Sequence, residues 1–250
     1  MAAAEHLDLI DRHAERIVPD DVALKAWCAQ YFRSHRQRLA DDLSHIEREL
    51  PSGALLELGS SPPFLTAALK EAGREVVGVD IAPDRFARCT EELGLDIRAC
   101  DIEREAMPFG DGEFGGVIFN EIFEHLRIDL IHTMSEIARV TAPGGRVMLT
   151  TPNMRSARGL ISLAVRGRSA FLCPNVFEQY EKLRSIGHMG HVREYTERDV
   201  LELCSKTGFS HRTTIWRRAA RASVFEKAVC GVVPSLRPSM SIILDRAGSM

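Results

Sequence analysis

The pattern of apolar and polar positions divides the chain into two parts with different periods. Over the first 50 residues, apolar side chains recur at helical spacing, for example in "LADDLSHIEREL" (residues 39–50). Pro19 and the two aspartates after it predict a break between two helices. A Pro-Ser-Gly turn follows residue 50. We therefore expect an N-terminal helical cap over residues 1–50 and a separate domain over residues 51–250.

From residue 54 onwards, short apolar runs alternate with amphipathic segments, which predicts parallel strands covered by helices on both faces. Right-handed crossovers then give an α/β fold with a doubly wound, Rossmann-like sheet and a ligand crevice at the carboxyl ends of the strands. Seven strands are predicted, the last two of them after an interruption of the alternation. They are "ALLEL" (54–58), "EVVGVD" (75–80), "DIRAC" (96–100), "GGVIFN" (115–120), "GGRVMLTT" (144–151), "HRTTIW" (211–216) and "SMSIILDR" (239–246).

The alternation is interrupted over residues 154–194. This insertion contains a helix-like part, "ARGLISLAVRG", and an aromatic part with Phe171, Phe177 and Tyr180. We interpret it as a lid over the ligand crevice, with the aromatic side chains packed inside the lid. After it, Thr196 is expected to begin a helix with a near capping box.

Composition limits the classes of partner. The net charge of −3 and the charged fraction of 27% are ordinary for a globular protein and give no general attraction to nucleic acid or to anionic membranes. A local basic cluster, "HRTTIWRRAARA" (residues 211–222), is interpreted as a solvated strand end, with contact to an anionic substrate or to nucleic acid as the alternative. A small molecule or a glycan is therefore the expected substrate, and nucleic acid is not expected as a partner.

The cysteines and the N-terminus bear on the cellular compartment. The six cysteines form no C-x-x-C pair and have no zinc-finger spacing, so we expect free thiols in a reducing compartment. The N-terminus has acidic residues where a signal peptide would have basic ones, and no apolar run approaches the roughly 20 residues that span a bilayer. We expect a cytoplasmic protein, and the sequence does not distinguish a monomer from a homodimer.

Polar residues follow four consecutive predicted strands. The first strand is followed by Gly59, whose missing Cβ lets a ligand approach the backbone, and the second ends at Asp80, which is suited to accept hydrogen bonds from a ribose diol. The third is followed by Asp101 and the fourth by "NEIFEHL" (residues 120–126). A single acid at a strand end is usually a helix cap. Four such strand-end features in order, at one edge of a sheet, indicate a ligand site.

These residues, together with "VVGVDIAP" and "IARVTAPGGRVMLTTPN", resemble the class I S-adenosylmethionine-dependent methyltransferases over about residues 50–153. Within that family the chain looks like the small-molecule and glycan group, and the resemblance implies S-adenosylmethionine as cofactor. A nicotinamide-binding fold shares the acid after the second strand but requires a G-x-G-x-x-G turn, which this chain lacks. The cofactor-binding residues implied by the resemblance are Glu57, Gly59, Ser60 and Ser61 for the methionine part, Asp80 and Ile81 for the ribose, Asp101 and Ile102 for the adenine, and Asn120 and Glu121 near the sulfonium.

The turn after the first strand departs from the family pattern. "LLELGSSPPFLTAAL" (residues 55–69) has Ser61 and Pro63 where further glycines are usual. We expect Ser60 or Ser61 to cap the following helix and Pro62 and Pro63 to lie in its first turn. Because proline has no N–H, the turn offers fewer donors to the cofactor carboxylate, and the serine hydroxyls would substitute for them.

The chemistry of the acceptor is expected at an E-x-x-E-H motif. Glu121, Glu124 and His125 are predicted to share one helical face, and "GHMGHVREY" adds His188 and His191. Carboxylates with imidazoles can hold a divalent cation such as Mg²⁺.

The same arrangement resembles that of metal-dependent members, the plant small-RNA 2′-O-methyltransferases and the ubiquinone-pathway O-methyltransferases. Three interpretations stay open: a metal held by Glu121, Glu124, His125 and His191; a metal-free site in which His125, His188 or His191 is the base or contacts substrate; and a structural role for all of them. Arg193 and Tyr195 are interpreted as structural.

The sequence thus favours an enzyme that O-methylates a hydroxyl of a sugar, a glycan or a natural-product metabolite, with or without a divalent cation. An RNA 2′-O-methyltransferase is one alternative, motivated by the metal motif and the arginine cluster. A non-catalytic scaffold with the same fold that has lost its cofactor is the other, motivated by the missing glycines.

Overall fold

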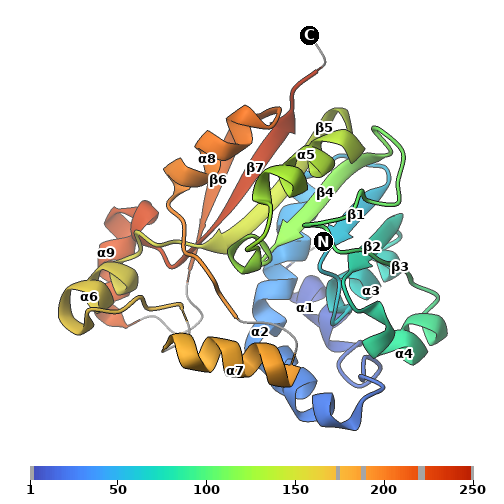
Figure 1. Ribbon diagram of the computed structural model, residues 1–250, viewed down its shortest axis with the longest axis horizontal. Helices are drawn as coiled ribbons and strands as arrows, with labels where there is room; N and C mark the ends of the chain where they lie inside the picture. The colour runs from blue at the N-terminus through green and yellow to red at the C-terminus, as the bar shows by residue number, and fades with distance from the viewer. Residues whose placement is uncertain (1–2, 173–174, 187–189, 219–222, 249–250) are drawn as a thin grey trace.

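The computed structural model describes residues 3–172, 175–186, 190–218 and 223–248, and its centre is one seven-stranded sheet (Figure 1). The strand order is β3-β2-β1-β4-β5-β7-β6, and β7 runs antiparallel to both of its neighbours. This arrangement confirms the predicted doubly wound sheet and its seven strands. The strands are β1 (Leu55–Leu58), β2 (Val76–Asp80), β3 (Asp96–Ala99), β4 (Phe114–Asn120), β5 (Thr141–Pro152), β6 (Phe209–Arg217) and β7 (Ser239–Arg246).

Helices cover both faces of the sheet. Neighbouring residues of β1 point into two separate cores, since Leu55 packs with α1, α2 and α3 while Leu56 packs with α5 and α8. The period of two along a strand thus distributes a continuous apolar run to both faces. The helices are α1 (Ala3–Asp11), α2 (Val22–Glu49), α3 (Phe64–Glu71), the 3₁₀ turn η1 (Pro83–Phe86), α4 (Ala87–Glu92), the 3₁₀ turn η2 (Phe123–His125), α5 (Leu130–Val140), α6 (Ala157–Arg166), α7 (Val176–Ile186), α8 (Glu197–Lys206), α9 (Val224–Val232) and the 3₁₀ turn η3 (Pro234–Leu236).

The N-terminal region is helical as predicted, and the break falls near Pro19, between α1 and α2. The long helix α2 is fixed to the end of β6 by a buried ion pair, in which the guanidinium of Arg217 donates to the carboxylate of Asp42. Arg217 also donates to the backbone carbonyl of Arg38 at 3.2 Å. Part of the predicted basic cluster is therefore not a solvated strand end, because Arg217 is only 8% exposed, whereas His211 and Arg212 are exposed.

The turn between β1 and α3 differs from the expectation. The N-cap of α3 is Pro63, and no side chain caps the helix, so neither Ser60 nor Ser61 is the cap. The hydroxyl of Ser60 is buried and donates to the carbonyl of Val79 at 3.3 Å, which turns it away from the helix terminus. The peptide bond between Ser61 and Pro62 is cis. The capping box of α8, by contrast, is confirmed, with Thr196 and Asp199 in the expected positions.

The insertion forms two helices, α6 and α7, and α7 lies beyond the carboxyl ends of β4 and β5 (Figure 1). The expectation of aromatic packing inside it is wrong for two of the three side chains, since Phe177 and Tyr180 are mostly exposed, whereas Phe171 is half-buried. No helix in the described part of the chain is long and apolar enough to cross a bilayer.

The half-buried His45 on α2 makes stability depend on pH. Burial lowers the pKa of His45 to about 4, and the positive charges of Arg217 and Arg48 act in the same direction, against the opposing charges of Asp41 and Glu49. The folded state therefore keeps this imidazole neutral while the unfolded chain takes up a proton below about pH 6.5. Its contribution is present above that pH and is lost as the pH falls towards 4. We expect the loss in unfolding free energy between pH 7 and pH 5 to be smaller by about 1 kcal/mol in His45→Gln.

The measurement is urea denaturation of the two proteins at both pH values. His211→Gln is the matched control, because His211 is exposed on β6. An equal pH dependence of the wild type and the His45→Gln variant would contradict the assignment.

Candidate functional site

The candidate cofactor residues lie at one edge of the sheet, because β1, β2, β3 and β4 are parallel and end there. Three of the groups expected to contact the cofactor have hydrogen-bond partners within the protein. The backbone N–H groups of Gly59 and Ser60 both donate to the carbonyl of Val79, at 2.8 and 3.1 Å. The carboxyl group of Glu57 accepts a hydrogen bond from the hydroxyl of Thr66 on α3. Glu57 and the two amides thus fix the turn to β2 and α3.

Glu57 is also electrostatically unusual. Burial raises the pKa of its carboxyl group to about 8, although the hydrogen bond from Thr66 acts in the opposite direction. A carboxyl group with this pKa carries a proton at neutral pH, so Glu57 adds no negative charge to the edge of the sheet there.

Asp80 and Ile81 lie at the end of β2. One carboxylate oxygen of Asp80 accepts the N–H of Ala82 at 2.9 Å, which orients the side chain. Burial raises the pKa of Asp80, and this hydrogen bond opposes the shift. Ile81 is 68% exposed, an uncommon position for a large apolar side chain at the edge of a buried sheet. Together they present a carboxylate and an apolar side chain side by side.

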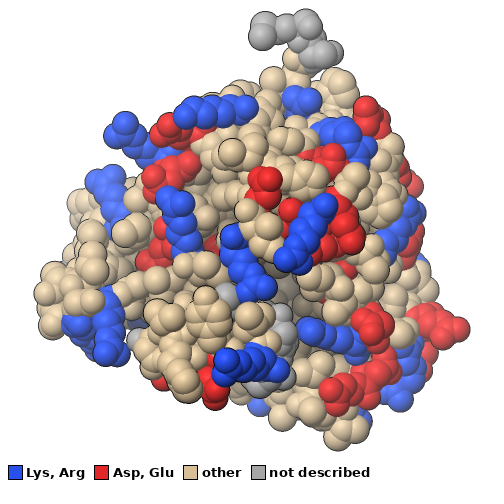
Figure 2. Space-filling model, in the orientation of Figure 1, with Lys and Arg blue, Asp and Glu red and all other residues tan. Residues whose placement is uncertain are grey.

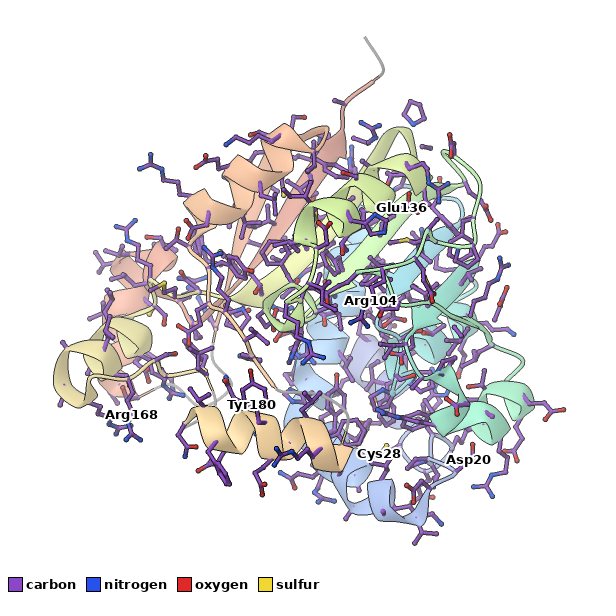
Figure 3. All side chains as sticks on the ribbon, viewed as in Figure 1. Asp20, Cys28, Arg104, Glu136, Arg168 and Tyr180 are labelled. Carbon is purple, nitrogen blue, oxygen red and sulfur yellow. The ribbon has the colours of Figure 1, made fainter. Side chains whose placement is uncertain are left out.

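After β3, Asp101 organises its own loop. Its carboxylate accepts the N–H of Glu103 and pairs with the guanidinium of Arg104, both at 3.1 Å (Arg104 is labelled in Figure 3). Ile102 is buried, and its carbonyl accepts the hydroxyl of Thr133 on α5 at 3.0 Å. The structure therefore places Asp101 and Ile102 in a fixed loop after β3, as the sequence predicts.

After β4, Asn120 and Glu121 face buried surroundings with unused hydrogen-bonding capacity. Neither polar atom of the Asn120 side chain has a hydrogen-bond partner among the described residues, and the same holds for Oε1 of Glu121. The other oxygen of Glu121 lies 3.8 Å from Nη1 of Arg38 on α2. Buried polar atoms usually have partners, so their convergence after one strand indicates a place for a ligand.

Arg38 is a site residue that sequence reasoning missed. Its guanidinium donates to the hydroxyl of Tyr31 at 3.0 Å, while its Nε is buried without a hydrogen-bond partner in the described part of the chain. The sequence contains one usable signal, the spacing of Arg38 four residues before Asp42, which is about one helical turn. The structure adds that Asp42 is buried. An acid and a base buried on the same face of a highly charged helix indicate a buried polar contact rather than solvent.

Glu124 and His125, at the end of the E-x-x-E-H motif, come together with His191, near the end of the insertion. One ligand atom from each lies within 4.8 Å of the others. The imidazole Nε2 of His191 lies 3.7 Å from Oε1 of Glu124, and the hydroxyl of Thr151 donates to Oε2 of Glu124 at 2.9 Å. The two histidine rings are 4.9 Å apart between centroids. These three residues were all predicted as ligands or bases.

Backbone groups at the end of the insertion form hydrogen bonds with Glu124 and His125. Nδ1 of His125 lies 2.8 Å from the carbonyl of Gly190, and the N–H of Val192 donates to the carbonyl of Glu124 at 2.8 Å. Because a carbonyl only accepts, Nδ1 of His125 carries the proton, which places the ring's lone pair on Nε2.

Glu121 does not share this cluster, and the expected single helical face is wrong. Only Phe123–His125 form a helical turn, of 3₁₀ type, so the motif does not lie on an α-helix. Glu121 precedes that turn with a φ of 56°, a left-handed conformation that is rare for a residue with a Cβ. Its side chain is directed to Arg38 instead. Of the four predicted metal ligands, the structure brings three together.

The pKa values of Glu124 and His125 are shifted in opposite directions. Burial lowers the pKa of His125 to about 4, and the neighbouring His191 acts in the same direction. Burial, followed by the charge of Glu121, raises the pKa of Glu124 well above its usual range. His125 is therefore a neutral imidazole at pH 7, a suitable state for a base or a metal ligand.

The remaining predicted residues divide as follows. His188 lies outside the described residues. Tyr195 is buried with its ring 4.5 Å from that of Phe123, and the guanidinium of Arg193 lies 4.9 Å from the Tyr195 ring centroid. Arg193 and Tyr195 therefore pack as a structural stack behind the cluster, as the sequence reasoning predicts.

Gly59 lies directly against Ile122, which connects the turn after β1 to the motif after β4. A Cβ at Gly59 would stand 2.2 Å from Cδ1 of Ile122, and the φ of Gly59 is +71°. We expect Gly59→Ala to lower the unfolding free energy by about 1–3 kcal/mol, from backbone strain together with the clash. Chemical denaturation measures this loss.

The double variant Gly59→Ala/Ile122→Ala separates the two causes, with Ile122→Ala alone as the reference. The clash is then absent, and the remaining loss should be that of the backbone strain. A Gly59→Ala variant as stable as the wild type would contradict this account.

Comparison with known proteins agrees with the geometry. A family model described as a methyltransferase domain matches residues 56–149. The chain is 36% identical over 114 residues to a demethylmenaquinone methyltransferase of Thermus thermophilus. The aligned region covers 43% of this chain and 51% of the relative. It is 31% identical over 121 residues to a ubiquinone biosynthesis O-methyltransferase of Methylococcus capsulatus, which covers 47% of this chain and 50% of the relative. The matched part is thus about half the length of each of these relatives.

The fold is also that of solved methyltransferases. A SAM-dependent methyltransferase from Archaeoglobus fulgidus has a TM-score of 0.59 and 17% identity, and the match covers 86% of this chain and 96% of that one. The strand order and the reversed β7 agree with this likeness of fold. Residues 56–149 thus match a methyltransferase domain, and the fold is the one found in solved S-adenosylmethionine-dependent methyltransferases.

Proposed function

We propose that the protein transfers a methyl group from S-adenosylmethionine to a hydroxyl oxygen of a small-molecule acceptor, such as a sugar, a glycan or a natural-product metabolite. The observation that carries the proposal is the convergence of Glu124, His125 and His191 beside the strand-end residues of β1 to β4. The names of relatives that methylate quinones support a small-molecule acceptor.

Strand-end residues supply the cofactor side of this site. Asp80 would accept the ribose hydroxyls, the exposed Ile81 would cover the adenine, and Asp101 with Ile102 would flank it. Asn120 and Glu121, with their unused polar atoms, would lie near the sulfonium. Binding of this kind explains why a large apolar side chain is exposed beside a nearly buried carboxylate.

Arg38 would compensate for the unusual turn at the methionine end. Pro62 and Pro63 have no N–H, and those of Gly59 and Ser60 already donate to Val79. A carboxylate therefore needs donors from elsewhere, and the guanidinium of Arg38 has a buried Nε without a hydrogen-bond partner in the described chain. The N–H and the hydroxyl of Ser61 lie beside the carboxylate of Asp80, and the hydroxyl would be a second donor.

The cofactor supplies an activated methyl group, so that a C–O bond forms as the C–S bond breaks and the electron pair stays on sulfur. The protein must then align the hydroxyl and accept its proton. The neutral imidazole of His125, with its lone pair on Nε2, is the base we propose. The carbonyl of Gly190 holds that ring in the required orientation.

The cluster also fits a divalent cation. Oε1 of Glu124 has no hydrogen-bond partner among the described residues, although it lies in a buried position beside two imidazoles. With Glu121 turned to Arg38, the donor set is one carboxylate and two imidazoles, which favours zinc, manganese or iron over magnesium. A cation held by Glu124, His125 and His191 would lower the pKa of the acceptor hydroxyl.

The alternative of an RNA substrate is less well supported. Arg217, in the middle of the basic cluster, is buried against Asp42. On the face shown in Figure 2, basic and acidic side chains are interspersed and do not form a single positive surface. A nucleic-acid site would need a continuous basic stripe.

The cofactor assignment predicts that Asp80→Ala weakens binding of S-adenosylhomocysteine. We expect wild-type dissociation constants in the micromolar range, about −8 kcal/mol, and a loss of at least about tenfold in the variant. Calorimetry measures both, and Asp84→Ala, an exposed acid in the following turn, is the matched control. Unchanged affinity in Asp80→Ala would refute the site, and no binding by the wild type would favour the scaffold alternative.

The acceptor assignment predicts that His191→Ala and Glu124→Gln each reduce methyl transfer to the accepted hydroxyl compound by at least about 100-fold. The assay follows labelled methyl from S-adenosylmethionine into a panel of sugars, phenols and polyketides. His211→Ala, on β6, should retain activity.

Titration with Mn²⁺ or Zn²⁺ then distinguishes the two forms of the site. Metal binding that is lost in Glu124→Gln, together with activity that a chelator abolishes, would support the cation-dependent form of the site. Chelator-resistant activity that still requires His125 supports the metal-free base and excludes the cation. Full activity of both cluster variants would overturn the proposal.

A further inference from the structure

A cavity lies between α6, α9 and the segment that begins β7, and the E-x-x-E-H cluster is not part of its lining. Its volume is about 280 Å³, near the lower end of the range for small-molecule sites. The helices α6 and α9 pack side by side at one end of the molecule (Figure 1), where Arg168 follows α6 (Figure 3). No residue proposed above for the cofactor or for the acceptor lines it.

The cavity is rich in positive charge. Four basic side chains line it, and the single acid among the lining residues, Glu226, is already paired with Arg158 at 3.3 Å. Arg218, Lys227 and Arg237 remain without an ion pair among the described residues. Arg237 is held in place by a hydrogen bond from Nη1 to the carbonyl of Trp216 at 2.8 Å, while its Nε is buried and has no hydrogen-bond partner in the described part of the chain. An anion would satisfy these donors.

Most of the other lining side chains are apolar. Leu236 and Pro238 contribute aliphatic surface, and Cys230 contributes a thiol that donates to the carbonyl of Leu236 at 3.3 Å. With this internal hydrogen bond, that side of the cavity has little polar capacity left for a ligand.

Gly231 provides an independent observation. It lies in the last turn of α9 and lines the cavity, and a Cβ built there would meet no atom within 4 Å. Neither backbone conformation nor a close neighbour therefore requires a glycine, although glycine in a helix costs about 1 kcal/mol relative to alanine. The missing side chain has one local consequence, which is to keep the wall of the cavity open.

We propose that this cavity binds a small amphiphilic anion. A carboxylate or phosphate would be held by Arg218, Lys227 and Arg237, and a short apolar segment would lie along Gly231 and Leu236. A cation is disfavoured by the excess of basic side chains, and a fully polar anion would leave the apolar walls without a partner.

The backbone connects this cavity to the reaction site. The side-chain amide of Asn153 donates to the carbonyls of Ser235 and Arg237, at 2.9 and 2.8 Å, and its backbone N–H donates to that of Pro238 at 2.9 Å. Two residues earlier on the same chain, Thr151 donates to Glu124. The bound anion is therefore either the distal end of the methyl acceptor or a separate small ligand, and the chemistry of recognition is the same in both.

Direct binding tests the site without any methyl transfer, so that its failure is distinct from a failure of the proposed activity. The probes are octanoate and octyl phosphate, with octanol as the uncharged analogue, titrated calorimetrically into the full chain. We expect saturable binding of both anions and binding of octanol weaker by at least about tenfold. No saturable binding of either anion would overturn the proposal.

Gly231→Leu places a side chain into the cavity, and Gly231→Ala is its matched control. We expect anion affinity to fall by at least about tenfold in the leucine variant and by less than about threefold in the alanine variant. Both substitutions raise helix propensity, so thermal denaturation should show folded proteins no less stable than the wild type. Unchanged affinity in folded Gly231→Leu would refute the cavity as the site.

The double variant Arg218→Gln/Lys227→Gln tests the charge. It should remove the preference for octanoate over octanol, while Arg212→Gln, at the other end of β6, should keep it. Retained preference in the double variant would refute the assignment of these two side chains. With an acceptor identified as above, competitive inhibition by octanoate marks the cavity as part of the acceptor site, and non-competitive behaviour marks a separate ligand.

Discussion

The buried ion pair between Asp42 and Arg217 fixes the cap helix to the sheet, and the composition of the site depends on it. Removing one partner of a fully buried pair typically costs about 3–5 kcal/mol, so α2 is held firmly at the end of β6. Arg38 lies one helical turn before Asp42, which brings its guanidinium to Glu121 after β4. A residue of the N-terminal helices thereby lies at the edge of the sheet, beside the candidate site after β4.

The contact between Arg38 and Glu121 decides which side chains are left for the candidate metal site. A sequence motif with two glutamates and a histidine favours an oxygen-rich site, but the left-handed backbone at Glu121 and the attraction of Arg38 draw one carboxylate away. What is left beside Thr151 is one carboxylate and two imidazoles. The charge that Arg38 neutralises also matters, because a second carboxylate facing Glu124 would raise its pKa further and oppose the anionic form.

The fold, and the sheet edge at which the candidate residues meet, could be predicted from the sequence because both follow from local patterns. Alternating apolar runs determine the parallel sheet, and parallel strands bring Asp80, Asp101 and Asn120 to one edge regardless of how the loops run. The direction of each side chain could not be predicted in the same way. Whether Glu121 faces Glu124 or Arg38 depends on a helix more than 70 residues earlier, and on a φ that no pattern of residue types specifies.

In the serine-proline turn, too, the direction of a side chain could not be predicted from the sequence. The hydrogen bonds of this turn connect it to β2. Local propensity correctly indicates that the chain leaves β1 in a tight turn and enters α3, but it assigns the serine hydroxyl to the helix terminus. In the folded protein, the Ser60 hydroxyl and the amides of Gly59 and Ser60 instead donate to Val79 on the adjacent strand. A turn whose amides are used for strand packing cannot also bind a carboxylate through them. In the proposed site, donors to the methionine end of the cofactor come from side chains on separate elements, so cofactor binding would depend on the position of α2. The helical cap would then be a condition for binding the cofactor and not only a cover over it.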